Sequence, residues 1–308
     1  MNLAKKSHYN PCFWTALWNE KYFEAFFSGR ERQLTAREQS VFSLNVRSGK
    51  VYKTKVKEVH FDKGINVAEL TPEYMNAFAR RWYPEKRKSL VSYLAANPET
   101  LYIDFEDVLR GVEQTGLYDC VLHAARAGGI RSSLHKAHIT GALVVHASRS
   151  HEMLMTGLEA MERSGLGRFD AYWALKNTWS NPLALARAGQ PLAGAKWVLY
   201  RTREHTFPLC DSPVMVEPKR LTVILSPRLL LQVHIGIGAK EDKWTTVDGI
   251  SRGRVRQISR LTVANTYREI IFSDSSELSR WQKTRAFRER MEALSNSEGA
   301  CSARRRRC

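Results

Sequence analysis

The chain has 308 residues, of which 43% are hydrophobic, so it can fill a core without disulfides or a structural metal. Its five cysteines are scattered and form no Cys-x-x-Cys pair, which indicates neither a disulfide framework nor a thiolate zinc site. No apolar stretch approaches the length that spans a membrane. We therefore expect a cytoplasmic protein that has no membrane partner.

The charge is strongly basic, with 48 Lys and Arg against 31 Asp and Glu, giving +17. This exceeds what solubility requires and predicts a polyanionic partner, of which nucleic acid is the first candidate. A basic proteome is the alternative explanation. Basic residues gather near the C-terminus, and Arg304 to Arg307 form a run in the terminal tail. Those of the predicted helices form either a phosphate-contacting stripe or a solvated face: Arg252, Arg254, Arg256, Arg260, Arg268, Arg280, Lys283, Arg285, Arg288 and Arg290.

The N-terminal part predicts a helix followed by a hairpin. Aromatic residues at helical spacing over 13–27 indicate a buried helix that Gly29 ends. Residues 41–46 and 51–56 then alternate with period two on either side of Ser48-Gly49-Lys50. That pattern predicts a β-hairpin.

The rest of the chain predicts a helical middle, a small sheet and C-terminal helices. Thr71-Pro72-Glu73 is typical of a helix start, and Asn181-Pro182 begins a further short helix. The strands of a mostly antiparallel sheet are expected near 196–236. This order favours an α+β fold, with one domain over 1–294 and a disordered basic tail over 295–308. The expected helices are 89–96, 105–113, 117–127, 134–147, 152–163, 169–179, 254–272 and 276–294.

Three short motifs occur in a fixed order: His8-Tyr9-Asn10-Pro11, then Phe207-Pro208-Leu209-Cys210-Asp211-Ser212-Pro213-Val214, then Leu225-Ser226-Pro227. In this order and spacing the chain resembles the family called domain of unknown function 4238. Members of that family begin with His-Tyr-x-Pro and carry a later Asp-x-Pro-Val turn and a Leu-Ser-Pro strand end. Asn265 resembles the family's late helical Asn. The resemblance implies no activity.

The chain departs from that family pattern at two places. Cys210 stands where the family has Ser or Thr. No Arg-Thr-Pro occurs in the central helices, and the nearest segment is Ile130-Arg131-Ser132-Ser133. This segment makes Arg131 a candidate site residue.

The first functional hypothesis is nucleic-acid binding with metal-dependent cleavage of phosphodiester bonds. Asp211 would bind a divalent ion such as Mg²⁺ or Mn²⁺ or activate water, with His8 as the base and Arg131 stabilising phosphate charge. Arginines of the C-terminal stripe would steer the substrate. The predicted binding residues are Tyr9, Ser212, Arg254, Arg256 and Arg260.

The alternative is a non-enzymatic module that binds nucleic acid or an acidic protein. In this module the two motifs have a structural role and stabilise the fold. Asp211 would form a hydrogen bond with His8, with a turn amide, or with its own backbone in an Asx-turn.

Other candidate chemistries rest on single features. His135 and His138 lie three residues apart on a predicted helix and could share a metal ion. The third functional reading is a small-molecule enzyme with a pocket lined by Trp197, Tyr200 and His234. Cys210 precedes Asp211, whose charge would raise the thiol pKa, so it is not expected to be a nucleophile.

Overall fold

The computed structural model describes residues 7–8, 10–62, 67–69, 76–77, 79–80, 83–97, 102–104, 111, 113, 117–148, 150–164, 181–203, 206–212, 214–238 and 244–294. Four predicted features fall wholly or mostly outside these residues. They are the helix start at Thr71-Pro72-Glu73, the helices at 105–113 and 169–179, and the tail at 295–308.

The larger sheet has five strands in the order β12-β7-β11-β10-β9. All neighbours are antiparallel except β12, which runs parallel to β7. This confirms the predicted mostly antiparallel sheet and the α+β class. The sheet also includes β12, which the sequence pattern did not predict. The strands are β7 (Ala195–Arg201), β9 (Val214–Glu217), β10 (Arg220–Ser226), β11 (Leu229–Gly238) and β12 (Trp244–Asp248).

The second sheet has four strands in the order β3-β2-β13-β8. Strands β2 (Ser40–Asn45) and β3 (Val51–Lys55) form the predicted hairpin, with Ser40 opposite Lys55 and Leu44 opposite Val51. Central strand β13 (Glu269–Phe272) pairs with β2 and with β8 (Leu209–Cys210). The sheet therefore joins segments from the start, middle and end of the chain.

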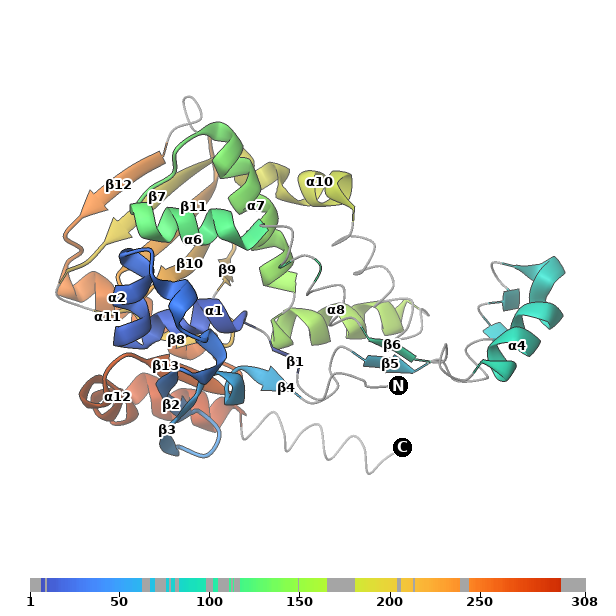
Figure 1. The fold of residues 1–308 in the computed structure, drawn as a ribbon, viewed down its shortest axis with the longest axis horizontal. Coiled ribbons are helices and arrows are strands. Elements are labelled where there is room, and N and C mark those ends of the chain that lie inside the picture. The colour runs from blue at the N-terminus through green and yellow to red at the C-terminus, as the bar shows by residue number, and fades with distance from the viewer. Residues whose placement is uncertain are drawn as a thin grey trace.

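Helices cover the larger sheet, as Figure 1 shows. Helix α6 (Leu117–Ala127) packs on β10, α7 (Ser133–Ser148) on β9, and α10 (Pro182–Ala193) on β11. These three helices were predicted closely. The predicted 13–27 helix is instead divided into α1 (Cys12–Thr15), a 3-10 turn at Ala16–Trp18 and α2 (Glu20–Phe27). The division occurs because Asn19 is extended and caps α2 by accepting from the Tyr22 amide.

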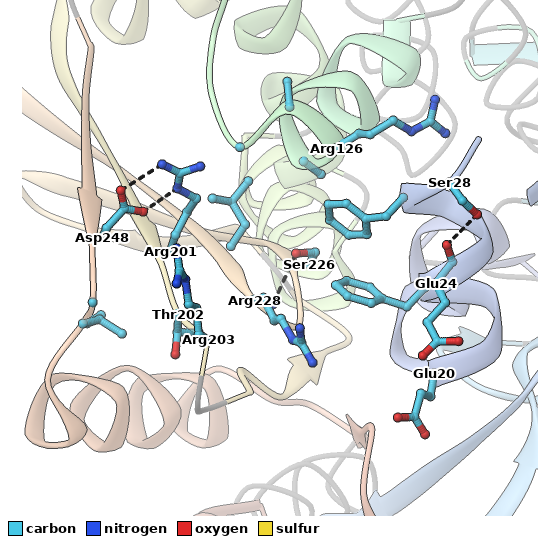
Figure 2. A pocket seen from close by; sticks show the side chains of 18 residues that line it. Glu20, Glu24, Ser28, Arg126, Arg201, Thr202, Arg203, Ser226, Arg228 and Asp248 are labelled. Atoms are coloured by element: carbon cyan, nitrogen blue, oxygen red, sulfur yellow. Dashed lines mark hydrogen bonds and ion pairs between the residues drawn. The ribbon is translucent and has the colours of Figure 1, made fainter. Parts of the chain in front are cut away.

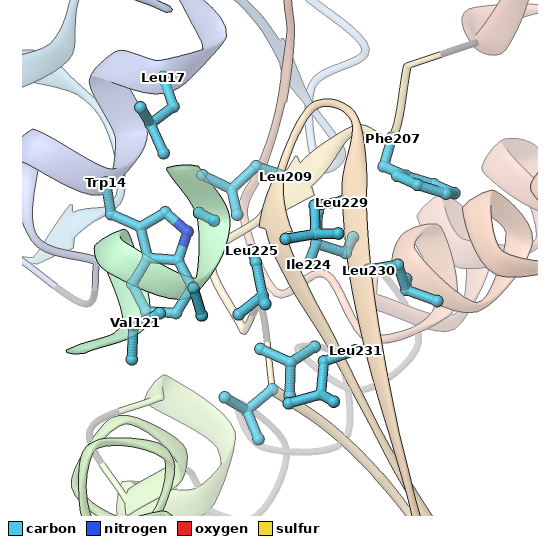
Figure 3. Close-up of a cluster of buried hydrophobic side chains, with 14 of the residues drawn as sticks. Trp14, Leu17, Val121, Phe207, Leu209, Ile224, Leu225, Leu229, Leu230 and Leu231 are labelled. Carbon is cyan, nitrogen blue, oxygen red and sulfur yellow. The ribbon is translucent and has the colours of Figure 1, made fainter. Parts of the chain in front are cut away.

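The main core lies between the larger sheet and the helices α1, α6 and α7 (Figure 3). Trp14 and Leu17 from the N-terminal helices meet Val121 of α6 and the apolar strands there. The Trp18 indole nitrogen donates to the Phe207 carbonyl at 2.7 Å. The aromatic N-terminal segment is thus anchored to the strand that leads to Asp211.

A second core lies on the opposite face of the four-stranded sheet. Ile270 and Phe272 of β13 point into it, whereas the alternate residue Ile271 belongs to the main core. Helix α12 (Ser275–Gln282) contributes Leu278, and the following helical segment at 285–294 contributes Phe287. Strand β13 is therefore buried on both faces.

Two predicted C-terminal helices are wrong in extent. The helix expected over 254–272 is observed as α11 (Arg252–Ala264), with Asn265 as its C-cap. The last four residues of the expected helix, 269–272, instead form strand β13. A strand buried on both faces shows no alternation, so its pattern matches a buried helix equally well. The helix expected over 276–294 is interrupted at 283–284, after α12.

The remaining elements are short strands and two helices. Strand β1 (Ser7–His8) pairs with β4 (Phe61–Asp62), and β5 (Val67–Glu69) pairs with β6 (Tyr102–Asp104). Helices α4 (Arg87–Ala96) and α8 (His151–Arg163) agree with the prediction to within two residues. Among the described residues, no helix combines the length and apolar character that crossing a membrane requires.

Gly189 allows α10 to approach α7 closely. A Cβ at this buried position would lie 2.5 Å from the Thr140 methyl carbon, whereas a Cβ at Gly157 in α8 would meet nothing within 4 Å. We expect Gly189→Ala to lower the free energy of unfolding by about 1 to 2 kcal/mol through overpacking. Gly157→Ala should raise it by up to about 1 kcal/mol, because alanine favours helix. Chemical denaturation of the two variants checks this; equal effects would contradict the close approach.

Candidate functional site

Asp211 lies directly after β8 and is almost completely buried, with 1% of its surface exposed. Its carboxylate accepts three backbone amide protons from the segment that begins β13. The Tyr267 amide donates to Oδ1 at 2.9 Å, and the Arg268 and Glu269 amides donate to Oδ2 at 2.5 and 3.2 Å. Asp211 therefore joins β8 to a segment more than 50 residues away, instead of closing an Asx-turn on its own backbone.

Burial dominates the electrostatics of this carboxylate. Desolvation raises the pKa of Asp211 to about 6, although the three amide hydrogen bonds act to lower it. The nearby Glu269 carboxylate adds to the increase. The folded protein thus binds a proton at Asp211 more readily than an exposed aspartate would.

Glu269 is the second buried carboxylate of this cluster, with 3% of its surface exposed. It accepts from the Tyr52 hydroxyl through Oε1 and from the His60 amide through Oε2, the latter at 3.0 Å. Burial, together with Glu269, raises the pKa of Tyr52 to about 12. His60 has φ of 51°, a left-handed conformation that is uncommon for a residue with a side chain and that these contacts hold in place.

Asn10 connects the two sequence motifs. Its amide nitrogen donates to the Cys210 carbonyl at 2.9 Å and to Nδ1 of His60 at 2.7 Å. Because Nδ1 accepts, the other ring nitrogen Nε2 carries the proton and donates to the Glu269 carbonyl at 3.2 Å. The unspecified residue of His-Tyr-x-Pro therefore contacts Cys210, the residue directly before Asp-x-Pro.

The other predicted site residues lie in different surroundings. His8 forms β1 opposite Phe61, while its side chain and all of Tyr9 fall outside the described residues. Ser212 is buried, and its hydroxyl has no hydrogen-bond partner among the described residues. Arg131 is exposed before α7, where its amide donates to His135 Nδ1. It is not among the groups that bond Asp211.

The geometry around Asp211 supplies amides instead of metal ligands. Within the described residues, no group of three His, Cys, Asp or Glu side chains could hold a metal ion. His135 uses its second ring nitrogen on the Cys120 carbonyl at 2.8 Å. Burial, and then the Asp211 charge, raises the pKa of the Cys210 thiol, which confirms the predicted direction.

A basic groove of about 1030 Å³ lies between α11, α12 and residues 284–289. Arg252, Arg256 and Arg260 line one wall because residues four apart share a helix face. Arg280, Trp281 and Arg285 line the other wall. The sequence pattern predicted binding roles for Arg256 and Arg260 and placed Arg252, Arg280 and Arg285 in a possible phosphate-contacting stripe, but it did not select Trp281.

We call this space the arginine groove. Most of its arginines lack a carboxylate partner. Its three acidic residues are engaged: Asp274 caps α12, Glu277 accepts from the Thr206 hydroxyl, and Glu289 pairs with Arg285 at 2.6 Å. Within the described part of the chain, no ion pair forms to the remaining arginines, which are Arg252, Arg256, Arg260 and Arg280.

Arg254 faces away from the arginine groove. Its guanidinium donates to the Gln232 side chain at 2.9 Å and to Gln257 at 2.7 Å. This contact with the larger sheet follows from its place on the helix, two residues from Arg252 and Arg256.

Comparison with family models, with curated proteins and with solved structures finds no match for this chain. The resemblance to domain of unknown function 4238 stays a prediction.

Replacing Asp211 with alanine should destabilise the protein strongly. Three buried amides would lose their acceptor, so we expect Asp211→Ala to lower the free energy of unfolding by about 3 to 5 kcal/mol. The matched control is Asp248→Ala, which removes an exposed pair with Arg201 and should cost less than about 1 kcal/mol. Urea denaturation measures both. A cost below about 1 kcal/mol for Asp211→Ala would refute the structural role.

The raised pKa of Asp211 also predicts how stability depends on pH. Between about pH 4 and pH 6 the folded state holds a proton that the unfolded state has released, so the free energy of unfolding falls as pH rises. The loss from this group is on the order of 3 kcal/mol. Asp211→Asn should lack this component, whatever its absolute stability. Equal pH slopes in the parent and the variant would show that Asp211 does not titrate there.

Proposed function

We propose that the protein binds nucleic acid through the arginine groove between α11 and α12. The observation that carries the proposal is the set of four exposed arginines in one groove without carboxylate partners: Arg252, Arg256, Arg260 and Arg280. Unpaired guanidinium groups gain most from phosphate contacts, because no existing ion pair has to be broken.

The chemistry of the arginine groove suits a phosphate backbone. Guanidinium groups bind phosphate through paired hydrogen bonds, and release of counterions adds affinity that does not depend on sequence. The walls are helices held by Leu278, Val255 and Ile258 in the protein interior, so the arginines project from a fixed surface. A surface of this kind is preorganised for its ligand.

We also propose that the two motifs have a structural role, joining distant segments of the chain, and do not react with substrate. The buried, amide-bonded state of Asp211 and the Asn10 contact support this role. The metal-dependent cleavage hypothesis stays a prediction that the binding experiment also tests.

Reversing charge in the arginine groove should weaken binding. With about four phosphate contacts, the logarithm of affinity for a single strand should fall with the logarithm of salt with a slope near −3. We expect Arg256→Glu with Arg260→Glu to lower affinity for DNA and RNA at least about tenfold and to reduce the slope magnitude by about 1 to 2. Fluorescence anisotropy with labelled oligonucleotides over a salt series measures both quantities.

The control is Arg187→Glu on the exposed part of α10, which reverses one charge away from the arginine groove. It should change affinity much less than the groove variant. Affinity that responds only to net charge, wherever the substitution lies, would refute a localised interface. Gel analysis of the same samples with Mg²⁺, Mn²⁺ or EDTA reveals any cleavage, which the hypothesis assigns to Asp211.

A further inference from the structure

A second cavity, of about 1040 Å³, has a lining that shares no residue with the arginine groove. It is bounded by α2, the β10–β11 turn, the C-terminal end of α6 and the residues that follow β7 and β12. Figure 2 shows Glu20 and Glu24 on α2 facing Arg228 on the turn. We call this space the α2 cavity.

The α2 cavity has an aromatic wall. Phe23 and Phe27 stand one helical turn apart, with ring centroids 4.6 Å apart, and Phe27 is 43% exposed. The guanidinium carbon of Arg228 lies 5.5 Å from the Phe23 ring centroid. Exposed aromatic faces next to a guanidinium group form a stacking surface for a planar, electron-rich ring.

Some arginines of the α2 cavity form ion pairs with carboxylates and others do not. Arg201 forms two hydrogen bonds with Asp248, at 2.6 and 2.9 Å, and Arg126 pairs with Glu31. No ion pair involves Arg203 or Arg228 in the part of the chain that the structure describes. Both arginines are exposed; Arg228 faces Glu20 and Glu24, so Arg203 is the arginine available for an anion beside the aromatic wall.

The exposed carboxylates of Glu20 and Glu24 complete the lining. Carboxylates accept hydrogen bonds from hydroxyl and amino groups, whereas they repel phosphate. A ligand that fits all three features carries a planar ring, hydrogen-bond donors and a phosphate. A nucleotide combines these groups.

Residues that are close together in the chain line the α2 cavity and the arginine groove. Ile250 lines the cavity and Arg252 lines the groove, so their Cα atoms are at most about 7.6 Å apart. Arg203 likewise lines the cavity, and Thr206 lines the groove. A single strand that follows the groove can therefore reach the cavity.

We propose that the α2 cavity receives one unpaired base of a single-stranded nucleic acid whose backbone lies in the arginine groove. The inference rests on the proposed function. Phe27 stacks on the base, Arg203 contacts the adjoining phosphate, and Glu24 accepts from the sugar or base. A duplex keeps its bases paired and gains nothing from the cavity, so the protein should prefer single strands.

The test compares single-stranded and duplex oligonucleotides of equal length and base composition on the parent, Phe27→Ala and Phe27→Trp. Loss of a stacking partner typically weakens binding about 5- to 100-fold. We expect Phe27→Ala to lose this factor for the single strand and to leave duplex affinity unchanged. Phe27→Trp should restore single-strand affinity, and equal thermal melting would show that all three proteins are folded.

The variants separate the two proposals. If the Arg256→Glu and Arg260→Glu variant weakens binding but Phe27→Ala leaves single-strand affinity unchanged, the α2 cavity proposal fails and the arginine groove proposal stands. If Phe27→Ala weakens both ligands equally, the cavity proposal also fails. If neither variant changes binding, both proposals fail.

A free nucleotide provides a further arm of the test. Adenosine monophosphate is titrated alone and in competition with the oligonucleotide. If it binds in a Phe27-dependent manner while oligonucleotides do not bind, the strand proposal is overturned.

Discussion

Three amide hydrogen bonds to one buried carboxylate fix the start of the strand that the rest of the structure is built around. Asp211 holds residues 267–269, and these lead directly into β13, the central strand of the four-stranded sheet. Since β13 places Ile271 in the main core and Ile270 in the second core, its register decides how both cores pack. A slip of one residue would exchange these two faces. One carboxylate thus contributes to the packing of two hydrophobic cores.

The same constraint determines the geometry of the arginine groove. Helix α11 ends at Ala264, three residues before the first amide that Asp211 accepts, and α12 begins at Ser275, three residues after β13 ends. The helices that form the groove walls are therefore tethered on either side of the fixed strand. Asp211 is far in sequence from the helices of the arginine groove, but strand β13 connects it to both of them. The Asp211 segment can therefore position the arginine groove without lining it.

The sequence predicted the parts of the fold that have local signatures. The hairpin at 40–55 alternates with period two, and α6 has an amphipathic pattern with glycines at its borders, so both were found. Strand β13 was missed because burial on both faces removes alternation. Asn10, His60 and Glu269 were missed as well, because their contacts join segments 50 to 209 residues apart and carry no local pattern. The sequence did gather the arginines of both helices into one stripe, whereas the fold was required to show that Arg256 and Arg260 line a groove and Arg254 bonds Gln232.

The pairing of arginines is more informative than their number. A net charge of +17 describes the whole chain, yet several arginines are neutralised locally, including Arg201 by Asp248 and Arg220 by Glu217. The guanidinium charge in such a pair is already compensated by a carboxylate, so a paired arginine gains less from binding a phosphate. The segment from Asp248 to Arg252 contributes residues to both spaces, because Asp248 to Ile250 line the α2 cavity and Arg252 lines the groove. The two proposals therefore rest on which arginines lack an ion pair, because a polyanion would contact these and not the neutralised ones.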